Sequence, residues 1–186
     1  MKKWIALVVA VIIIVTVGVL VFNGYHKKEA VIPPEQEGAA TVEKSPVTVS
    51  ISTPKGEILV ELRPDLMPIT VTNFLKLLDS KFYEGLTFHR VEDWVVQGGD
   101  PKGDGTGGPG WEIKLETNPQ LKNERGAIAM ARSSEPDSAG SQFYILKNDA
   151  SWLDGQYAVF GKVIKGMEVV DQLAIGDKMN LKRVQK

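Results

Sequence analysis

The sequence predicts a mainly β domain, folded as a closed antiparallel barrel, behind one transmembrane helix. Three observations favour this fold class. From Pro46 onward, many short apolar or alternating runs have the length of strands. Only two stretches have the apolar period of an α-helix, and strands and helices do not alternate along the chain. Before this part, nineteen residues from Trp4 to Phe22 carry no charge.

The uncharged run 4–22 follows a short flank, residues 1–3. As an α-helix it would be about 28 Å long, which matches the hydrocarbon core of a bilayer. A cleaved signal peptide usually has a shorter apolar region, about 7–15 residues, followed by an Ala-x-Ala-like site. The chain instead continues as Asn23-Gly24-Tyr25. We therefore predict a retained membrane anchor, with a cleaved signal peptide as the alternative.

Two lysines stand on each side of this run, so the positive-inside rule is nearly balanced. The free amino group slightly favours a cytoplasmic N-terminus. A span behind so short a flank also behaves most simply as an export signal. We expect a single-pass protein of the cell membrane whose remaining part lies outside the cytoplasm.

Residues 23–45 form the next segment and are predicted to be a flexible linker. They show no apolar period and include Pro33-Pro34 together with several glutamates and glutamines. The remaining residues, 46–186, suffice for one ordinary domain with its own apolar core.

The domain is predicted to open with a β-hairpin. Apolar residues alternate with polar ones on both sides of a turn at 53–56, which predicts two strands with one buried face. The alternating residues are Val47, Val49 and Ile51 before the turn and Ile58, Val60 and Leu62 after it.

An amphipathic helix follows the hairpin. Pro68 suits its first position, and four apolar residues then occupy the i, i+3, i+4 and i+7 positions of one face. These four residues are Val71, Phe74, Leu75 and Leu78. A second helical stretch is expected at about 166–174. Further strands are expected at 86–91, 94–98, 126–131, 141–146, 157–163 and 181–184.

The composition excludes several classes of site. The net charge is −1, which gives no basic surface for nucleic acid. The chain has no cysteine, so disulfides, zinc-thiolate sites and cysteine nucleophiles are excluded. Only two histidines, His26 and His89, are present, too few for a histidine-based metal cluster. We expect no metal and no cofactor.

Residues 103–108 match the G-x-G-x-x-G pattern of dinucleotide-binding folds. Such a site needs a helix directly after the glycines, to present amide groups to the phosphates. Here Pro109-Gly110 follows, and the segment is interpreted as a tight surface loop.

The segment 88–100 carries the strongest functional signal. Arg90 and Gln97 stand seven residues apart among apolar and aromatic residues. Taken alone, they could be a surface cation and a strand residue bonded to the backbone. Aromatic and apolar residues nearby and further along the chain instead indicate a pocket for an apolar ring, with a donor at its rim. These residues are Trp94, Tyr144, Trp152, Leu153 and Tyr157.

Five motifs, in this order, resemble those of the cyclophilins, a family of peptidyl-prolyl cis-trans isomerases. They are Phe88-His89-Arg90, Gln97-Gly98-Gly99-Asp100, Gly105-Thr106-Gly107-Gly108, Gly140-Ser141-Gln142-Phe143 and Trp152-Leu153-Asp154-Gly155. The resemblance covers about residues 46–186. It implies an eight-stranded antiparallel barrel capped by two helices. Proline-containing polypeptides would bind in a groove on the outside of this barrel.

The resemblance also implies roles for residues of this chain. Arg90 matches the catalytic arginine, and Gln97 would hold both Arg90 and the substrate backbone. The implied proline pocket consists of Trp94, Val95, Tyr144 and Leu153. The implied groove for residues before the proline consists of Gly105, Ala131, Arg132 and Gln142. Trp152 matches a tryptophan associated with binding the cyclic peptide cyclosporin, and Tyr157 stands where a histidine is frequent.

The chain departs from the family's pattern close to the catalytic arginine. Arg90 and Gln97 are one residue closer than in many cyclophilins, with Glu92-Asp93 at the turn. Trp94 stands where many members have phenylalanine. Arg132 replaces a frequent asparagine whose contact is largely through the backbone.

Together these features predict an isomerase that accelerates rotation of X-Pro bonds in folding chains at the outer face of the membrane. The predicted mechanism is non-covalent and arginine-assisted. The alternative is a membrane-tethered proline-peptide binding or chaperone module with incidental isomerase activity. The intact pair Arg90 and Gln97 favours the enzyme, because a pure binding module would not need it.

Overall fold

The structure, a computed structural model, describes residues 43–184. The predicted flank 1–3, the predicted membrane span 4–22 and residues 23–42 of the predicted linker lie outside the described residues. Within residues 43–184, no helix combines the length and the apolar character needed to cross a bilayer.

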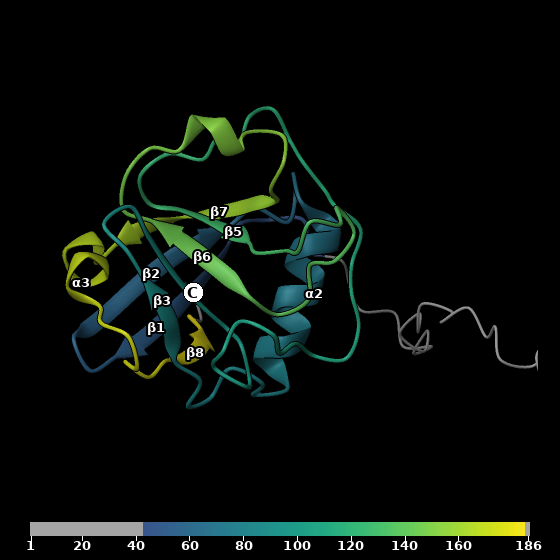
Figure 1. The fold of residues 1–186 in the computed structure, drawn as a ribbon. Helices are drawn as coiled ribbons and strands as arrows, with labels where there is room; N and C mark the ends of the chain where they lie inside the picture. Colours follow the sequence, from purple (N-terminus) through teal and green to yellow (C-terminus); the bar gives the residue numbers. More distant parts are fainter. Residues whose placement is uncertain (1–42, 185–186) are drawn as a thin grey trace, which may run out of the picture. The chain divides into compact units, whose positions relative to one another are not determined.

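Eight strands form one antiparallel sheet in the described residues (Figure 1). Their order across the sheet is β3-β4-β6-β5-β7-β2-β1-β8. The strands are β1 Val47–Thr53, β2 Gly56–Leu62, β3 Phe88–Val91, β4 Val95–Gly98, β5 Ala127–Met130, β6 Phe143–Leu146, β7 Val159–Lys165 and β8 Asn180–Arg183. The predicted hairpin and all later predicted strands are present, which confirms a mainly β domain.

The sheet curls but does not close into the predicted barrel. β3 and β8 stand at its two ends and do not pair with each other as strands. The residues just ahead of them meet instead: Thr87 and Lys178 form a single bridge, and the N–H of Phe88 donates to the carbonyl of Asp177 at 3.0 Å. Each end strand forms a ladder with one neighbour only, β3 with β4 and β8 with β1. The prediction of a closed barrel is therefore corrected to a curled, half-barrel sheet.

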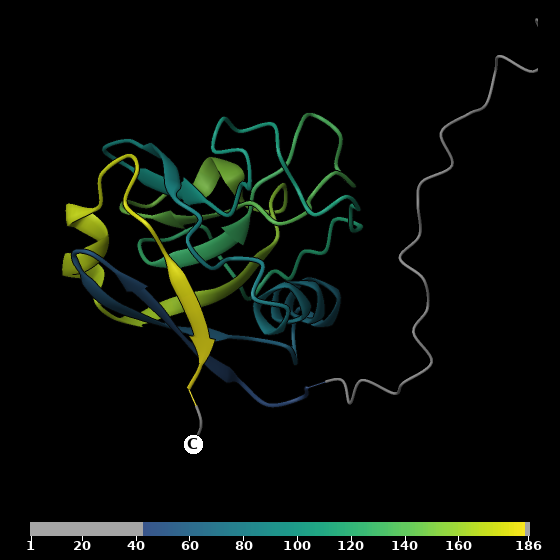
Figure 2. The same cartoon turned by 90° about the horizontal axis from the view of Figure 1, so that it is seen from below.

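Within residues 43–184, two α-helices pack at opposite ends of the curled sheet (Figures 1 and 2). α2, Pro68–Asp79, begins at the predicted proline and buries all four predicted apolar residues. The ring centroid of its Phe74 lies 5.6 Å from that of Phe143 in β6 and 5.1 Å from that of Phe160 in β7. α3, Met167–Gln172, packs against β2, and a single 3-10 turn, η1 Ser151–Leu153, follows β6. α2 therefore covers one end of the sheet and contributes Phe74 to its interior.

Strands β4, β5 and β6 divide their side chains between two apolar clusters. Val96, Ile128 and Ile145 join the main core with α2, inside the sheet. Their chain neighbours Val95 and Tyr144 belong to a second, smaller cluster. Neighbouring residues of a strand point to opposite faces, so the second cluster lies on the outer face. This alternation places the predicted pocket residues outside the curled sheet.

α2 has no capping side chain of its own, since Met67 stands at its N-cap. Glu116, in a distant loop, supplies the acceptor. Its carboxylate accepts hydrogen bonds from the backbone N–H groups of Ile69 and Thr70 at 3.2 and 2.8 Å. A negative charge at this end also interacts favourably with the helix dipole. These two hydrogen bonds hold the loop around Glu116 against the N-terminus of α2.

We expect Glu116→Ala to lower the free energy of unfolding by about 1 kcal/mol, because two helix N–H groups lose their acceptor. For a domain of this size the melting temperature should fall by about 3 °C, measured by circular dichroism. Glu112→Ala is the control, since Glu112 is an exposed carboxylate near the same loop. An equal fall in both variants contradicts the capping role.

Candidate functional site

The hairpin of β3 and β4 brings Arg90 and Gln97 face to face. The two residues are cross-strand partners, so their spacing of seven in the sequence becomes one step across the sheet. Nη1 of Arg90 donates a hydrogen bond to Oε1 of Gln97 at 3.1 Å. A register shift between Phe88 and Arg90 gives this strand a local irregularity just before the arginine. The predicted pair is thus a direct contact.

A second glutamine extends this contact toward the glycine-rich loop. Nε2 of Gln97 donates to Oε1 of Gln142 at 2.9 Å. Nε2 of Gln142 in turn donates to the carbonyl oxygens of Gly105 and Gly107, each at 2.9 Å. Both hydrogens of the Gln142 amide are therefore used. The predicted residues Gln97, Gln142 and Gly105 form one hydrogen-bonded chain that starts at Arg90.

The buried carboxylate of Asp100 holds the glycine-rich loop in place. It accepts the backbone N–H groups of Lys102, Asp104 and Gly105 at 2.8, 3.1 and 2.6 Å. Burial works to raise the pKa of Asp100, but the backbone N–H groups of Lys102, Gly105 and Gly107 outweigh it and bring the pKa below its ordinary value. A Cβ at Gly107 would collide with the carboxylate, so a glycine is required there. The segment is a surface loop, and no helix follows it directly.

The predicted proline pocket coincides with the outer apolar cluster. Val95 and Tyr144, only 1% and 5% exposed, form its buried part. Trp94, Ala131, Leu153 and Tyr157 are partly buried and pack against it. The other buried members are small or aliphatic: Ala127, Ala129, Leu146, Ala150 and Val159. Residues from β4, β5, β6, η1 and the start of β7 thus meet in one apolar surface.

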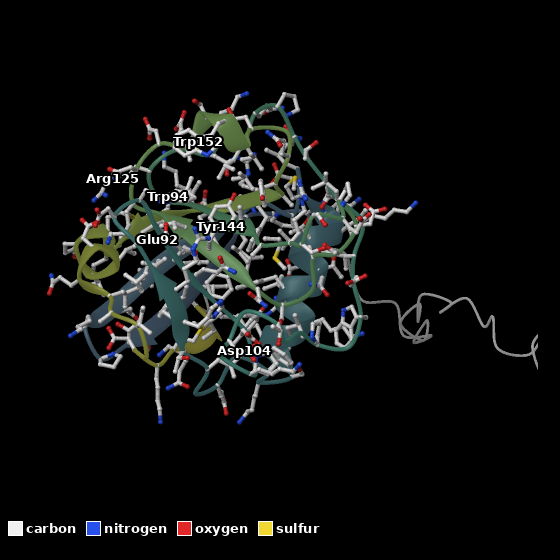
Figure 3. All side chains as sticks on the ribbon, in the orientation of Figure 1. Glu92, Trp94, Asp104, Arg125, Tyr144 and Trp152 are labelled. Carbon is white, nitrogen blue, oxygen red and sulfur yellow. The ribbon has the colours of Figure 1, made fainter. Side chains whose placement is uncertain are left out.

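Aromatic rings form the rim of this surface. The ring centroids of Trp94 and Trp152 are 5.9 Å apart, and Trp152 is 61% exposed. Tyr144 and Tyr157 pack edge to face, also at 5.9 Å. Figure 3 shows Glu92, Trp94, Tyr144 and Trp152 gathered on the same part of the fold. An apolar ring bound here would be enclosed by aromatic side chains, with the Arg90 guanidinium close by.

Two titratable side chains in and around the site have shifted pKa values. Burial lowers the pKa of His89, the only histidine in residues 43–184, so its imidazole is neutral. Burial raises the pKa of Tyr144, so its phenol stays protonated. The arrangement therefore offers an apolar pocket and charged hydrogen-bond donors, which suit chemistry without covalent steps.

Comparison with known proteins identifies the family. The family model for cyclophilin type peptidyl-prolyl cis-trans isomerase/CLD matches residues 47–186. The chain belongs to the cyclophilins. It is 48% identical over 132 residues to peptidyl-prolyl cis-trans isomerase B of Bacillus subtilis, covering 69% of this chain and 91% of that protein. It is 46% identical over 133 residues to a Helicobacter pylori peptidyl-prolyl cis-trans isomerase, covering 69% and 80%.

Solved structures agree with this assignment. A crystal structure of a Cryptosporidium parvum cyclophilin type isomerase matches with a TM-score of 0.71 and 31% identity, covering 76% of this chain and 99% of that one. A second structure of that protein, determined in the presence of the dipeptide Ala-Pro, gives a TM-score of 0.70, 32% identity, and coverage of 75% and 99%. This cyclophilin is therefore an enzyme, a peptidyl-prolyl cis-trans isomerase.

Arg132, which replaces a frequent asparagine of the family, turns toward the loop before β7. Its Nε donates to the carbonyl of Gln156 at 3.0 Å, and its guanidinium lies 4.6 Å from the ring centroid of Tyr157. The N–H of Ala131 donates to the carbonyl of Gln142 at 2.9 Å. The side chain of Arg132 thus supports the pocket wall at Tyr157.

Two residues at this cyclophilin's site, Glu92 and Asn123, were not predicted from the sequence as site residues. Glu92, which the sequence marked only as a turn residue, bonds both Arg90 and Trp94. Asn123 lies beneath the pocket and accepts the hydroxyl of Tyr144 at 2.7 Å. The backbone and amide nitrogens of Asn123 donate to Oδ1 of Asp154, and its N–H contributes most to lowering the pKa of that carboxyl. Asn123 stands in a loop without periodicity, so no pattern singled it out.

We expect Tyr144→Phe to destabilise the fold by about 1–2 kcal/mol, because it leaves the buried Oδ1 of Asn123 without its donor. Denaturant unfolding measures this change. Tyr157→Phe is the matched control, since no hydrogen bond of its hydroxyl is present in the described residues, and its stability should stay within about 0.5 kcal/mol of wild type. A Tyr144→Phe variant as stable as this control would contradict the stabilising role of the Tyr144 hydroxyl.

Proposed function

We propose that this cyclophilin isomerises X-Pro bonds in exported polypeptides as they fold, at the outer face of a cell membrane. We further propose that Arg90 promotes the rotation. The observation that carries the role of Arg90 is the position of its guanidinium, held at two nitrogens beside the apolar pocket. Its third nitrogen, Nη2, makes no hydrogen bond to any residue in the part of the chain that the structure describes.

Rotation about an X-Pro bond is opposed by amide resonance, with a barrier of about 18–20 kcal/mol. As the bond twists, the prolyl nitrogen loses conjugation and gains a lone pair. A guanidinium N–H aimed at that nitrogen bonds it strongly in the twisted state and weakly in either planar state. Such differential binding of the transition state accelerates the reaction without a covalent intermediate. Arginine suits this role, because it stays protonated in proteins.

The magnitudes require more than one effect. An acceleration of about a hundred-thousand-fold corresponds to about 7 kcal/mol. One charged hydrogen bond in a site that excludes water supplies about 2–4 kcal/mol of this. Removal of water from the amide and enclosure of the proline ring by the cluster around Val95 and Tyr144 supply the remainder. The pocket is therefore part of the catalytic apparatus as well as the binding site.

Gln97 orients the arginine and keeps one donor for the substrate. Its Oε1 accepts from Arg90, and one Nε2 hydrogen goes to Gln142. An amide nitrogen carries two hydrogens, so the second is available to a substrate carbonyl. Trp152, exposed at the rim, offers an apolar surface to larger ligands, including cyclic peptides of the cyclosporin type.

We expect Arg90→Ala to reduce turnover of a short Ala-Pro peptide by about a hundredfold or more, because the transition state loses its donor. Full-length wild type, Arg90→Ala and Arg90→Lys are compared in detergent by a cis-trans exchange assay. Lysine keeps the charge but lacks the planar fork, so Arg90→Lys should recover only a small part of the activity.

Arg63→Ala is the control for this series, because the Arg63 side chain pairs only with Asp65 among the described residues and stands directly after β2, away from the β3–β4 hairpin. Near-normal turnover in Arg90→Ala would disprove the role of Arg90. A folded wild type that binds proline peptides without isomerising them would favour the binding module instead.

The membrane location rests on the uncharged run 4–22 and its flanks. Because the chain has no cysteine, Lys55→Cys introduces a single thiol in the exposed turn between β1 and β2. We expect this thiol to react with a membrane-impermeant maleimide in intact spheroplasts and the protein to sediment with membranes. A variant that lacks residues 1–22 should be labelled only after lysis. Protection of the thiol in intact spheroplasts would contradict the outward orientation.

A further inference from the structure

We propose that Glu92 is a positioning residue of this isomerase, which fixes the guanidinium of Arg90 and the indole of Trp94 at the same time. The inference deepens the proposed function and rests on the role given there to Arg90. It concerns a residue in the turn where this chain departs from the family's spacing between Arg90 and Gln97.

The carboxylate of Glu92 has one oxygen for each partner. Nε of Arg90 donates to Oε1 at 2.7 Å, and Nε1 of Trp94 donates to Oε2 at 2.8 Å. The two partners also touch each other, since the guanidinium of Arg90 lies 5.4 Å from the ring centroid of Trp94. The three side chains therefore form a closed set of contacts. Figure 3 labels two of them, Glu92 and Trp94, which lie close to each other.

The turn that carries Glu92 is itself held in place. The N–H of Glu92 donates to the carbonyl of Val95 at 2.9 Å, which closes the hairpin. The N–H of Lys147 donates to the carbonyl of Trp94 at 2.8 Å, and Nδ2 of Asn148 donates to the carbonyl of Asp93 at 3.1 Å. The shortened turn is thus fastened to the segment after β6. The backbone that carries the carboxylate is therefore fixed, while the side chains of Arg90 and Glu92 are 41% and 44% exposed.

Two anchors define the direction of the free guanidinium nitrogen. A planar guanidinium held only by Gln97 at Nη1 can rotate about that hydrogen bond. The second hydrogen bond, from Nε to Glu92, fixes the plane and so the direction of Nη2. A donor that must meet the prolyl nitrogen only in the twisted state depends on this direction. Removal of Glu92 should therefore impair catalysis more than ground-state binding.

The second partner links Glu92 to the pocket. Trp94 packs on the outer cluster and faces Trp152 across 5.9 Å. The hydrogen bond from its indole N–H to Glu92 fixes the orientation of the Trp94 ring beside the pocket. The hydrogen bond from Arg90, followed by that from Trp94, lowers the pKa of Glu92, so the carboxylate is charged at neutral pH. One residue thus couples the donor to the surface that receives the proline.

The test compares four variants of the full chain: Glu92→Ala, Glu92→Gln, Asp93→Ala and Arg90→Ala. Asp93→Ala is the matched control, because it removes the neighbouring carboxylate of the same turn, which bonds neither Arg90 nor Trp94. We expect Glu92→Ala to lower kcat about tenfold with less than about a threefold change in KM. Glu92→Gln, with one acceptor for two donors, should lose about threefold, and Asp93→Ala should stay within about twofold of wild type.

A spectroscopic readout separates positioning from general damage to the fold. In ¹H–¹⁵N spectra, the Nε–H of Arg90 and the Nε1–H of Trp94 should both shift in Glu92→Ala and stay in place in Asp93→Ala. If Glu92→Ala equals Asp93→Ala in kcat, or if its kcat rises, the inference is overturned. If Arg90→Ala itself keeps its turnover, the proposed role of Arg90 fails as well. If Arg90→Ala loses activity and Glu92→Ala does not, only the role of Glu92 is overturned.

Discussion

Phe74 of α2 meets Phe143 of β6 edge to face inside the curled sheet, and this packing decides where a ligand can bind. The interior is occupied by these rings together with Tyr83 and Phe160, all fully buried. No large group can enter without displacing them. Because strand neighbours point to opposite faces, Tyr144 is directed outward where Phe143 is directed inward. The filled interior thus leaves the outer face as the place for the pocket.

On that outer face, polar groups form one continuous chain around the apolar surface. It runs from the loop carbonyl of Gly105 through Gln142 and Gln97 to Arg90, and from there through Glu92 to Trp94. Each member is hydrogen-bonded to the next, so the direction of the Arg90 guanidinium depends on the loop, the strand and the turn together. The local sequence at Arg90 explains only one part of this geometry.

Much of the site could be predicted from the sequence, because its signals are local. A spacing of seven residues across a short turn makes Arg90 and Gln97 cross-strand partners, and the strand alternation puts Val95 on the pocket face. The contacts that were missed join distant segments: Glu116 caps a helix that begins 48 residues earlier, and Asn123 reaches Tyr144 from an irregular loop. The lack of a ladder between β3 and β8 depends on where these strands end, and sequence patterns place strand ends least well.

Trp94 and Trp152 are two of the three tryptophans within residues 43–184, and both stand at the mouth of the pocket. Trp111, the third, packs on the main core and donates to Asn73. A proline peptide bound on the cluster beside these two rings would remove water from them and alter their fluorescence, while Trp111 supplies a steady background. The arrangement that shapes the pocket therefore makes occupancy visible in the intrinsic emission of the unlabelled protein.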